Sequence, residues 1–583
     1  MHWMKANLEV LKCQIPTLIR ERTNHIMGQQ TQTSSDPSSN AERAQPEERH
    51  LETSTLHQNA TEMQIHVCEA EKPESEKPEV HTQRLLKTRH LSLIAIGGTI
   101  GSGLFLGSGS ALATAGPIGA LIGFSLMGLI VFSVVTSLGE MCAFLPGPGS
   151  FTNYASRFVD PALGFAVGWN YWYCNAITLP AELTAAAIVI QYWSSPVPIA
   201  LWIGLFLFII VSINMLGAGT FGEAEFWMAL IKVITIVGLL ILGFILVMGG
   251  GPTHEFIGFK HWNHPGPFHW IMIDSPTGCF LATCAVFIQA AFSYLGSEMV
   301  SVTCGEAQSP STSIPRAAKR VLFRILVFYI TSVLVIGLLV PFDDPRLLGK
   351  NHDASASPFV IFVERAKINV LPHIINGVIL TSAVSAANSD LYSSSRTLYA
   401  LAMEGKAPKF LTRCTSQGLP YYCVQLTAVM GVLAFLNVNH GAGQVFTWLV
   451  AFTVITGLIA WSVICLSYIR FHRALGVQGI DRGTLPYRSP LQPYSAWFGL
   501  VSCVIIIIFN GFTTFSPFVA VDFCASYLGV VSFFALFIGW KWTKKTKMVP
   551  LSEIDFKVTK GYESKEEKEG SKSRWEKVLE MIM

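Results

Sequence analysis

The 583-residue chain has few charged side chains. Asp, Glu, Lys and Arg make up 14% of the residues, against about 25% in ordinary soluble domains. Hydrophobic residues make up 51%, and the mean hydropathy is +0.44. The formal net charge is only +3, which indicates neither nucleic-acid binding nor an acidic partner. This composition excludes an ordinary soluble domain and predicts a protein embedded in a lipid bilayer.

Patterns that indicate metal, redox or catalytic chemistry are also missing. The chain contains 12 cysteines but no CxxC pair, and most of the thiols lie in or beside apolar segments, where they pack well. No nucleotide-binding motif and no nucleophile–base pair is recognisable. We therefore expect no metal, no cofactor and no enzymatic reaction. The N-terminal stretch mixes charges into its apolar residues, so we also expect no signal peptide.

Charge is concentrated at the two ends of the chain. Residues 1–85 are rich in Ser, Thr, Gln, Glu and Pro and predict a disordered N-terminal tail. Residues 545–583 form a second charged tail. The long apolar runs lie in residues 86–544, which we interpret as one transmembrane domain.

Apolar periodicity predicts an all-α polytopic membrane protein with about 12 spans. Their centres lie near residues 103, 131, 176, 206, 237, 290, 331, 387, 429, 456, 503 and 530. Basic residues such as Arg316, Lys319, Arg320, Arg470 and Arg473 gather in loops on one side. The positive-inside rule makes that side cytoplasmic, with both termini inside.

The first predicted span is unusually rich in glycine. In IAIGGTIGSGLFLGSGSALATAG, residues 94–116, four glycines fall between Gly97 and Gly103. Glycine is a poor helix former, so Gly98–Gly103, with Gly101 at its centre, should unwind. Irregular backbone survives inside a membrane only where protein buries it or where it lines a cavity. A binding site is one explanation; close helix packing at small residues is the other.

A second interruption occurs in the sixth predicted span, CAVFIQAAFSYLGSEMVSVTCGEAQSP. Ser293, Gly296 and Ser297 interrupt this segment, and Glu298 follows directly. Interruptions at matching places in spans one and six suggest a leucine-transporter-like 5+5 inverted repeat, with helices 1 and 6 broken and two helices appended. Free N–H groups at such breaks suit a carboxylate, and free C=O groups suit an ammonium. Together they predict a receptor for an amino-acid backbone.

Two charged residues lie deep in apolar spans, where a charge is costly and needs a reason. Glu182, in span three, is interpreted either as a proton acceptor or as a structural hydrogen-bonding residue. Lys232, in span five, is about ten residues from either end of its segment. A buried lysine changes its charge readily, which suits proton coupling.

The remaining candidates have structural alternatives. Glu298 either fixes the second break by accepting N–H bonds or has a purely architectural role. Phe292 and Tyr294 are candidates to close over a ligand, although aromatic residues in spans more often pack. Asp390 and Arg396 are expected to pair with each other or with loop charges. Interfacial solvation is the expected explanation for a further acidic residue, Glu140.

Four segments in order, covering about residues 88 to 542, resemble the fungal amino-acid permeases, the yeast amino-acid transporter family within the amino acid–polyamine–organocation superfamily. The segments are RHLSLIAIGGTIGSGLFLGSG, PALGFAVGWNYWY with LPAELTAAAIVIQYW, FSYLGSEMVSVTCGEAQSPSTSIPRA, and SAANSDLYSSSRTLYALAMEGKAPKF. The resemblance implies a fold like that of bacterial leucine transporters and proton-driven amino-acid uptake at the plasma membrane.

The resemblance also implies roles for single residues. The backbone carbonyls of Thr99, Phe292 and Leu295 would bind the substrate ammonium. The N–H groups of Ser102 and Gly103 would bind its carboxylate.

Two further roles concern coupling. Lys232 matches a lysine that, in proton-coupled relatives, stands where sodium-coupled ones bind sodium, so no metal is implied. Glu182 matches an acidic position implicated in coupling or substrate recognition.

We therefore expect a proton-coupled importer of amino acids that works by alternating access. An amino-acid receptor of the same fold, signalling through its cytoplasmic tails, is the alternative. Expected partners are the amino acid, protons, the bilayer and, through tail lysines such as Lys72 and Lys77, the ubiquitin ligase machinery; for these lysines a solvated linker is the simpler interpretation. The preferred substrate side chain is not readable, because helix rotations decide which residues face it.

Overall fold

The computed structural model describes residues 86, 90–91, 93–94, 98, 100–147, 149–193, 197–252, 254–307, 310–348, 357–438, 442–515 and 518–557. The predicted N-terminal tail and residues 558–583 of the C-terminal tail lie outside them. Within these ranges the chain is helical, and its only β-type pairing is two isolated bridges.

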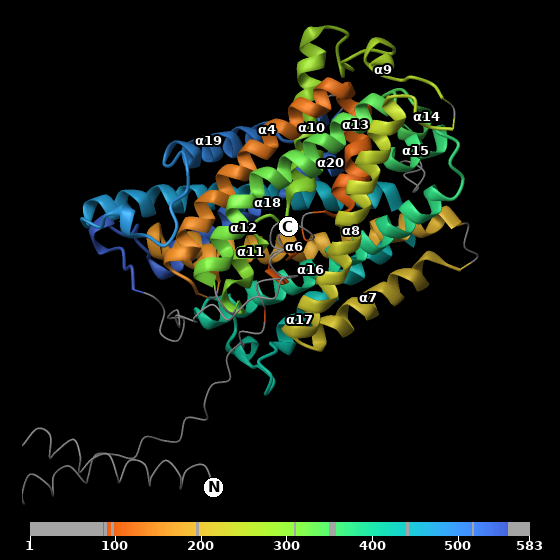
Figure 1. The fold of residues 1–583 in the computed structure, drawn as a ribbon. Coiled ribbons are helices and arrows are strands. Elements are labelled where there is room, and N and C mark those ends of the chain that lie inside the picture. The colour runs from red at the N-terminus through yellow and green to blue at the C-terminus, as the bar shows by residue number, and fades with distance from the viewer. Residues whose placement is uncertain are drawn as a thin grey trace, which may run out of the picture. The chain divides into compact units, whose positions relative to one another are not determined.

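The longer helices follow the apolar segments of the sequence (Figure 1). They are α4 Ser108–Phe144, α6 Pro161–Ile190, α7 Ile199–Met215, α8 Ala218–Val247, α10 Pro276–Tyr294, α12 Pro310–Arg324, α16 Leu371–Met403, α17 Tyr421–Met430, α18 Ala442–Val477, α19 Tyr494–Phe509 and α20 Ala520–Lys544. Shorter helices connect them: α5 Ser150–Phe158, α9 Lys260–Asn263, α11 Met299–Val302, α13 Thr331–Leu339, α14 Pro345–Leu348 and α15 Pro358–Arg365. Two π-helices occur: η1 Gly103–Gly107 leads into α4, and η4 Ile325–Ile330 joins α12 to α13. A 3-10 helix, η7 Gly431–Val438, continues α17.

The described helices form a multi-pass membrane architecture, although fewer than 12 qualify individually as spans. Eight are long and apolar enough to cross a bilayer: Gly103–Phe144, Pro161–Trp193, Ala218–Val247, Pro276–Val302, Ser313–Leu339, Gly443–Val477, Tyr494–Thr514 and Ala520–Lys544. Two shorter apolar helices are Ile199–Met215 and Tyr421–Asn437. The 33-residue α16 is outside the eight; its sequence is rich in serine and carries Asp390 and Arg396.

The first of these eight elements combines two predicted spans. At Gly116 the backbone is not helical, with φ 73° and ψ 177°, and Pro117 follows. A loop crosses there, since the N–H of His269 donates to the carbonyl of Ala115 and the N–H of Ile118 donates to Pro267, both at 3.0 Å. A Cβ at Gly116 would lie 2.8 Å from the nitrogen of His269. Glycine therefore permits a turn where the sequence predicts the end of one span and the start of the next.

Burial separates inner from outer helices. α6 and α16 pack against each other, and most of their residues are buried. Figure 1 shows α7 along the margin of the bundle, where one side of it packs against α6 and α16. Large apolar side chains are exposed on α7, α8 and α20, including Phe208 at 71%, Ile234 at 63% and Trp542 at 82%. Exposed apolar faces of this kind suit contact with lipid.

Candidate functional site

The second predicted break is present. α10 ends at Tyr294, Gly296 has a φ of 87°, and α11 begins at Met299. In the first segment, Gly98 lies in a turn, Ile100 and Gly101 lie in bends, and regular helical structure begins beside Gly103. Of the described residues of Gly98–Gly103, Gly98, Ile100 and Gly101 lie outside helices as predicted, whereas Ser102 and Gly103 are already helical. Thr99, assigned to the substrate site by resemblance, lies outside the described residues.

The helical segments beside the two interruptions touch at Gly103 of η1 and Ser293, which lies within α10 and, contrary to the prediction, does not itself interrupt the helix. A Cβ added at Gly103 would lie 2.7 Å from the Cα and 3.0 Å from the nitrogen of Ser293, and 3.1 Å from the ring of Phe292. No side chain fits at such distances, so this glycine permits backbone-to-backbone approach. For Gly103, the explanation that glycine allows close helix packing is therefore confirmed. The contact of its N–H with a substrate carboxylate stays a prediction.

The first segment is also tied to α6. The Ser102 hydroxyl donates to Glu182 Oε1 at 2.9 Å, and both side chains are buried. Gly101 lies between α6 and α16, since a Cβ there would be 3.1 Å from Glu182 Oε1 and 3.3 Å from the Cβ of Ala386. Among the described residues the other carboxylate oxygen, Glu182 Oε2, has no hydrogen-bond partner. Glu182 thus presents one bonded and one unbonded oxygen at the break.

Glu298 holds the second break in place. Its carboxylate accepts hydrogen bonds from the Tyr171 hydroxyl at 3.2 Å, the Trp461 indole N–H at 3.0 Å and the Gly296 N–H at 3.4 Å. The backbone bond is the one expected from the sequence. The phenol and the indole come from α6 and α18 and were not expected. Leu295 packs on α18, where a Cβ at Gly457 would lie 2.3 Å from its side chain.

The two aromatic candidates have different surroundings. Tyr294 is fully buried; its hydroxyl donates to the carbonyl of Phe124 at 3.2 Å, and its ring stacks on Tyr329 with centroids 4.2 Å apart. It lines neither of the two cavities described below, which supports the structural alternative. Phe292 meets Phe446 edge to face at 5.9 Å and lines both cavities.

A small cavity of about 30 Å³ lies between the two breaks. Its lining includes six predicted site residues: Gly101, Gly103, Glu182, Phe292, Leu295 and Glu298. Asp390 of α16 lines it as well, which the sequence did not lead us to expect. The volume suits a water molecule and is too small for an amino acid. A larger cavity of about 320 Å³ is lined in part by Gln289, Trp448 and Asp522. Phe292 is thus shared by the lining of the small polar chamber and that of the larger one.

Lys232 is fully buried in α8 and lines neither cavity. Its ammonium lies 3.9 Å from Glu225 Oε1, and both oxygens of Glu225 accept from the Ser385 hydroxyl at 2.8 Å. Glu225 was not predicted from the sequence as a partner of Lys232. Its spacing of seven residues from Lys232, two helical turns on one face, is the signal that could have identified it.

Arg396 pairs with a residue other than Asp390. Its guanidinium donates to Glu306 Oε1 at 3.0 Å, and the Tyr392 hydroxyl donates to Glu306 Oε2 at 2.6 Å. Of the two expected alternatives, pairing with Asp390 is wrong for Arg396 and pairing with a loop charge is confirmed, since Glu306 lies in the turn between α11 and α12.

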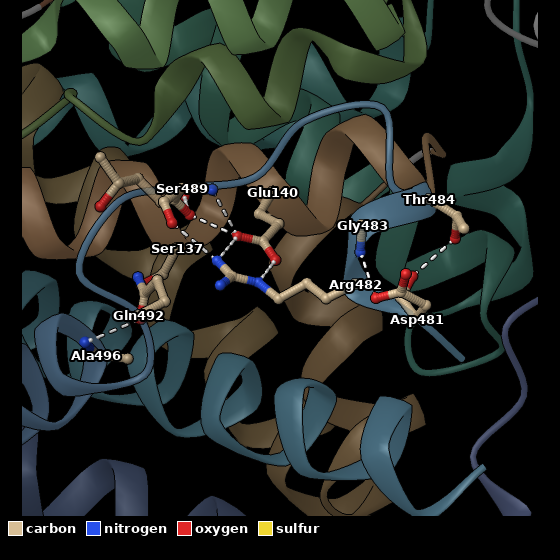
Figure 2. Close-up of polar contacts among 10 residues, drawn as sticks. Ser137, Glu140, Asp481, Arg482, Gly483, Thr484, Ser489, Gln492 and Ala496 are labelled. Atoms are coloured by element: carbon tan, nitrogen blue, oxygen red, sulfur yellow. Dashed lines mark hydrogen bonds and ion pairs between the residues drawn. The ribbon is translucent and has the colours of Figure 1, made fainter. Parts of the chain in front are cut away.

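Glu140 is also not a solvated interfacial group, because it is fully buried. Figure 2 shows the Arg482 guanidinium facing its carboxylate, with two contacts of 2.7 Å. The N–H and hydroxyl of Ser489 add bonds of 2.8 and 2.7 Å. The loop between α18 and α19 is thereby attached to the end of α4.

A loop aspartate, Asp344, forms a second ionic cluster. Asp344 Oδ2 contacts Arg346 at 2.8 Å and Arg365 at 3.0 Å. Burial raises the pKa of Asp344, but hydrogen bonds and charge from these guanidinium groups outweigh burial and lower it to about 2.

The comparisons with known proteins cover nearly all of the described chain. The family model for amino acid permeases matches residues 90–552. The chain is 42% identical to the dicarboxylic amino acid permease of Saccharomyces cerevisiae over 514 residues, which are 87% of this chain and 84% of that protein. It is 44% identical to the lysine-specific permease of the same yeast, over 82% and 78% of the two chains. It is 42% identical to that yeast's proline-specific permease, over 83% and 79%. With two interrupted helices meeting around a polar chamber, and with matches of this length, the chain belongs to the amino acid permease family, whose members are membrane transporters and not enzymes.

Proposed function

We propose that this protein is a proton-coupled secondary transporter that imports amino acids across the plasma membrane by alternating access. The observation that carries the proposal is the meeting of two interrupted helices at Gly103 and Ser293, beside a buried chamber lined by acidic side chains. Helix ends inside a membrane leave N–H and C=O groups that recognise opposite charges.

The substrate class follows from these backbone groups. N–H groups of Ser102 and Gly103 would hold a carboxylate, and carbonyls of Thr99, Phe292 and Leu295 would hold an ammonium. The yeast relatives bear the names of dicarboxylic amino acids, lysine and proline. Because those names differ in the side chain, we propose the shared amino-acid backbone as the recognised group and leave the side chain open.

Proton coupling is proposed from the buried charges. Lys232 and Glu225 form a close pair in the interior, and Glu182 has an unbonded oxygen at the first break. Burying ionised groups is costly unless each is paired, so a change of protonation changes how stable the arrangement is. In the proposal, Lys232 and Glu182 link proton binding to movement of the broken helices.

The proposed topology has 12 spans, arranged as a 5+5 inverted repeat plus two helices. The turn at Gly116 divides Gly103–Phe144 into two spans, which raises the eight candidate spans to nine. Ile199–Met215, Tyr421–Asn437 and α16 are proposed to cross the bilayer as well, which gives 12. The end of the bundle with the Glu140–Arg482 pair is then cytoplasmic, as are both termini.

Alternating access is proposed from the two chambers beside Phe292. In the proposal, the substrate enters from outside through the larger chamber. It then binds in the smaller chamber once the neighbouring helices have moved apart. A volume of about 30 Å³ corresponds to a closed site, which has to widen by movement of the breaks before an amino acid fits.

Uptake into proteoliposomes tests the function. The purified full-length chain is reconstituted with buffer inside, and radiolabelled amino acids are added outside at neutral and at acid pH. We expect accumulation above the external concentration only with the inward proton gradient, and loss of accumulation when an ionophore abolishes the gradient. Specific binding without accumulation would instead identify the receptor alternative.

A further inference from the structure

Asp390 presents an unsatisfied carboxylate oxygen in the membrane interior. Its Oδ2 is buried and has no hydrogen-bond partner among the residues that the structure describes. The residue lines the small chamber together with Glu182 and Glu298. Glu182 Oε2 has no partner either. Two residues that each carry an unbonded carboxylate oxygen thus line the same space of about 30 Å³.

The neighbouring acidic groups are accounted for. Glu298 accepts from an indole, a phenol and a backbone N–H, as described above. Glu225 accepts from Ser385 and lies beside Lys232. On its own helix, Asp390 gains no counter-charge from Arg396, whose guanidinium is bound to Glu306.

The groups that act electrostatically on Asp390 come from each element around it. They are Glu182 and Cys174 of α6, Glu225 and Lys232 of α8, and Glu298 of the second break. Lys232 is the one cation in this set, and its nearest carboxylate is that of Glu225. The set therefore has more acidic groups than basic ones. Among the described residues, the lining of the chamber itself holds three carboxyl groups and no basic side chain, a composition that a bound proton stabilises.

We propose that Asp390 binds the coupled proton, with Glu182 as its partner across the chamber. The inference rests on the proposed proton-driven transport. A proton from water joins Oδ2, and the new O–H donates to Glu182 Oε2 or to a water between them. When the site opens to the other side, the O–H bond breaks and the proton returns to water. No covalent change of the substrate and no other reactant is involved.

The neutral form explains why an unpaired aspartate is tolerated here. A protonated carboxyl has a donor as well as an acceptor, so one proton satisfies two unbonded oxygens at once. Neutralising Asp390 also removes its repulsion of Glu182, which favours closing the break around the substrate. Proton binding and closure are thereby coupled.

The test compares two kinds of transport in the full-length protein, reconstituted in proteoliposomes with a mixture of radiolabelled amino acids. Exchange without a gradient needs substrate binding and movement but no net proton flow. Accumulation under an inward proton gradient needs both. For Asp390→Asn, which imitates the protonated side chain, we expect exchange to be retained, accumulation to be lost, and the pH dependence of exchange to flatten. Asp481→Asn, in the loop beside Arg482, is the matched control and should behave as wild type.

Each other result is decisive. If Asp390→Asn accumulates substrate with the wild-type pH dependence, the assignment is wrong. If exchange and accumulation fall together in correctly inserted protein, Asp390 contacts the substrate ammonium instead. If Asp390→Asn does not insert into the membrane, Asp390→Glu is tested in its place. This variant keeps the carboxyl but displaces it, so the proposal requires a shift in the pH dependence of accumulation. An unchanged pH dependence contradicts the proposal. If wild type itself does not accumulate substrate, the proposed function fails, which is distinguishable from failure of Asp390 alone.

Discussion

The hydroxyl of Ser102 donates to Glu182 Oε1 at 2.9 Å and so joins the first break to the centre of α6. Eighty positions separate the two residues in the sequence. Among the described residues, the second oxygen of the Glu182 carboxylate has no hydrogen-bond partner. A change in the charge of Glu182 would therefore change a hydrogen bond to the segment that is proposed to bind substrate.

Removing this donor should destabilise the protein. Ser102→Ala leaves the buried Glu182 carboxylate without that hydrogen bond, and an unsatisfied buried group costs about 1–3 kcal/mol. We expect a lower melting temperature in detergent and weaker uptake. Ser102→Thr keeps the hydroxyl and is the control; equal loss in both variants would show that the hydrogen bond is not the cause.

Lys232→Ala should abolish gradient-driven accumulation more than it weakens substrate binding. The substitution leaves Glu225 without its neighbouring cation in the interior, although Lys232 itself does not line either chamber. Binding is measured by displacement of a radiolabelled amino acid, and accumulation by uptake under a proton gradient. Lys260→Ala, in an exposed loop pair with Glu255, is the control. Unchanged accumulation in Lys232→Ala would refute the coupling role.

Gly103→Ala should eliminate uptake by inserting one methyl group where two backbones meet. The new Cβ would lie 2.7 Å from the Cα of Ser293, so the breaks must separate. Overpacking of this kind typically costs about 1–3 kcal/mol. Gly238→Ala on α8 has nothing within 4 Å of its Cβ and should be tolerated. Uptake and melting temperature are measured for both, and normal uptake by Gly103→Ala would contradict the contact.

Arg482→Ala should lower stability strongly, because it leaves the buried Glu140 carboxylate with Ser489 as its one hydrogen-bonding residue in the part of the chain that the structure describes. Breaking a buried ion pair by removing one partner costs about 3–5 kcal/mol, and the exposed part of Arg482 places the expected value at the lower end. Adding Glu140→Gln should restore part of the lost melting temperature. If the double variant is as unstable as the sum of the single variants, the two residues are not coupled.

Acid should weaken the cluster around Asp344. Its pKa is about 2 in the folded protein against an ordinary value of 3.8. A lowered folded pKa stabilises the fold above the ordinary value, and this contribution is lost as the pH falls from about 3.8 towards 2. The melting temperature should therefore fall across that interval, and Asp344→Asn should make the fall smaller. An identical pH profile for the variant would exclude Asp344 as a contributor.

Local sequence was enough to predict the interruptions, because glycine and serine act on the backbone where they stand. The turn at Gly296, the irregular path of Gly101 and the N–H bond from Gly296 to Glu298 all belong to this class. Membrane architecture was predictable for the same reason, since length and apolarity are properties of single segments.

Partners distant in sequence were not predictable. Glu140 and Arg482 are 342 positions apart, and Glu298 and Trp461 are 163 apart. Each pairing depends on how two helices are rotated about their axes, which a single sequence does not specify. The same uncertainty explains why the sequence left Asp390 with two possible pairings, to Arg396 or to loop charges, and did not place it at the small chamber.

The contact between Gly103 and Ser293 limits where the molecule can bend. Because the two backbones are already in contact, η1 and the end of α10 cannot come closer together, and the small chamber widens only if they separate. Glycines with positive φ follow both segments, Gly116 after η1 and Gly296 after α10. We therefore expect the backbone to bend at these two glycines when the site opens to substrate.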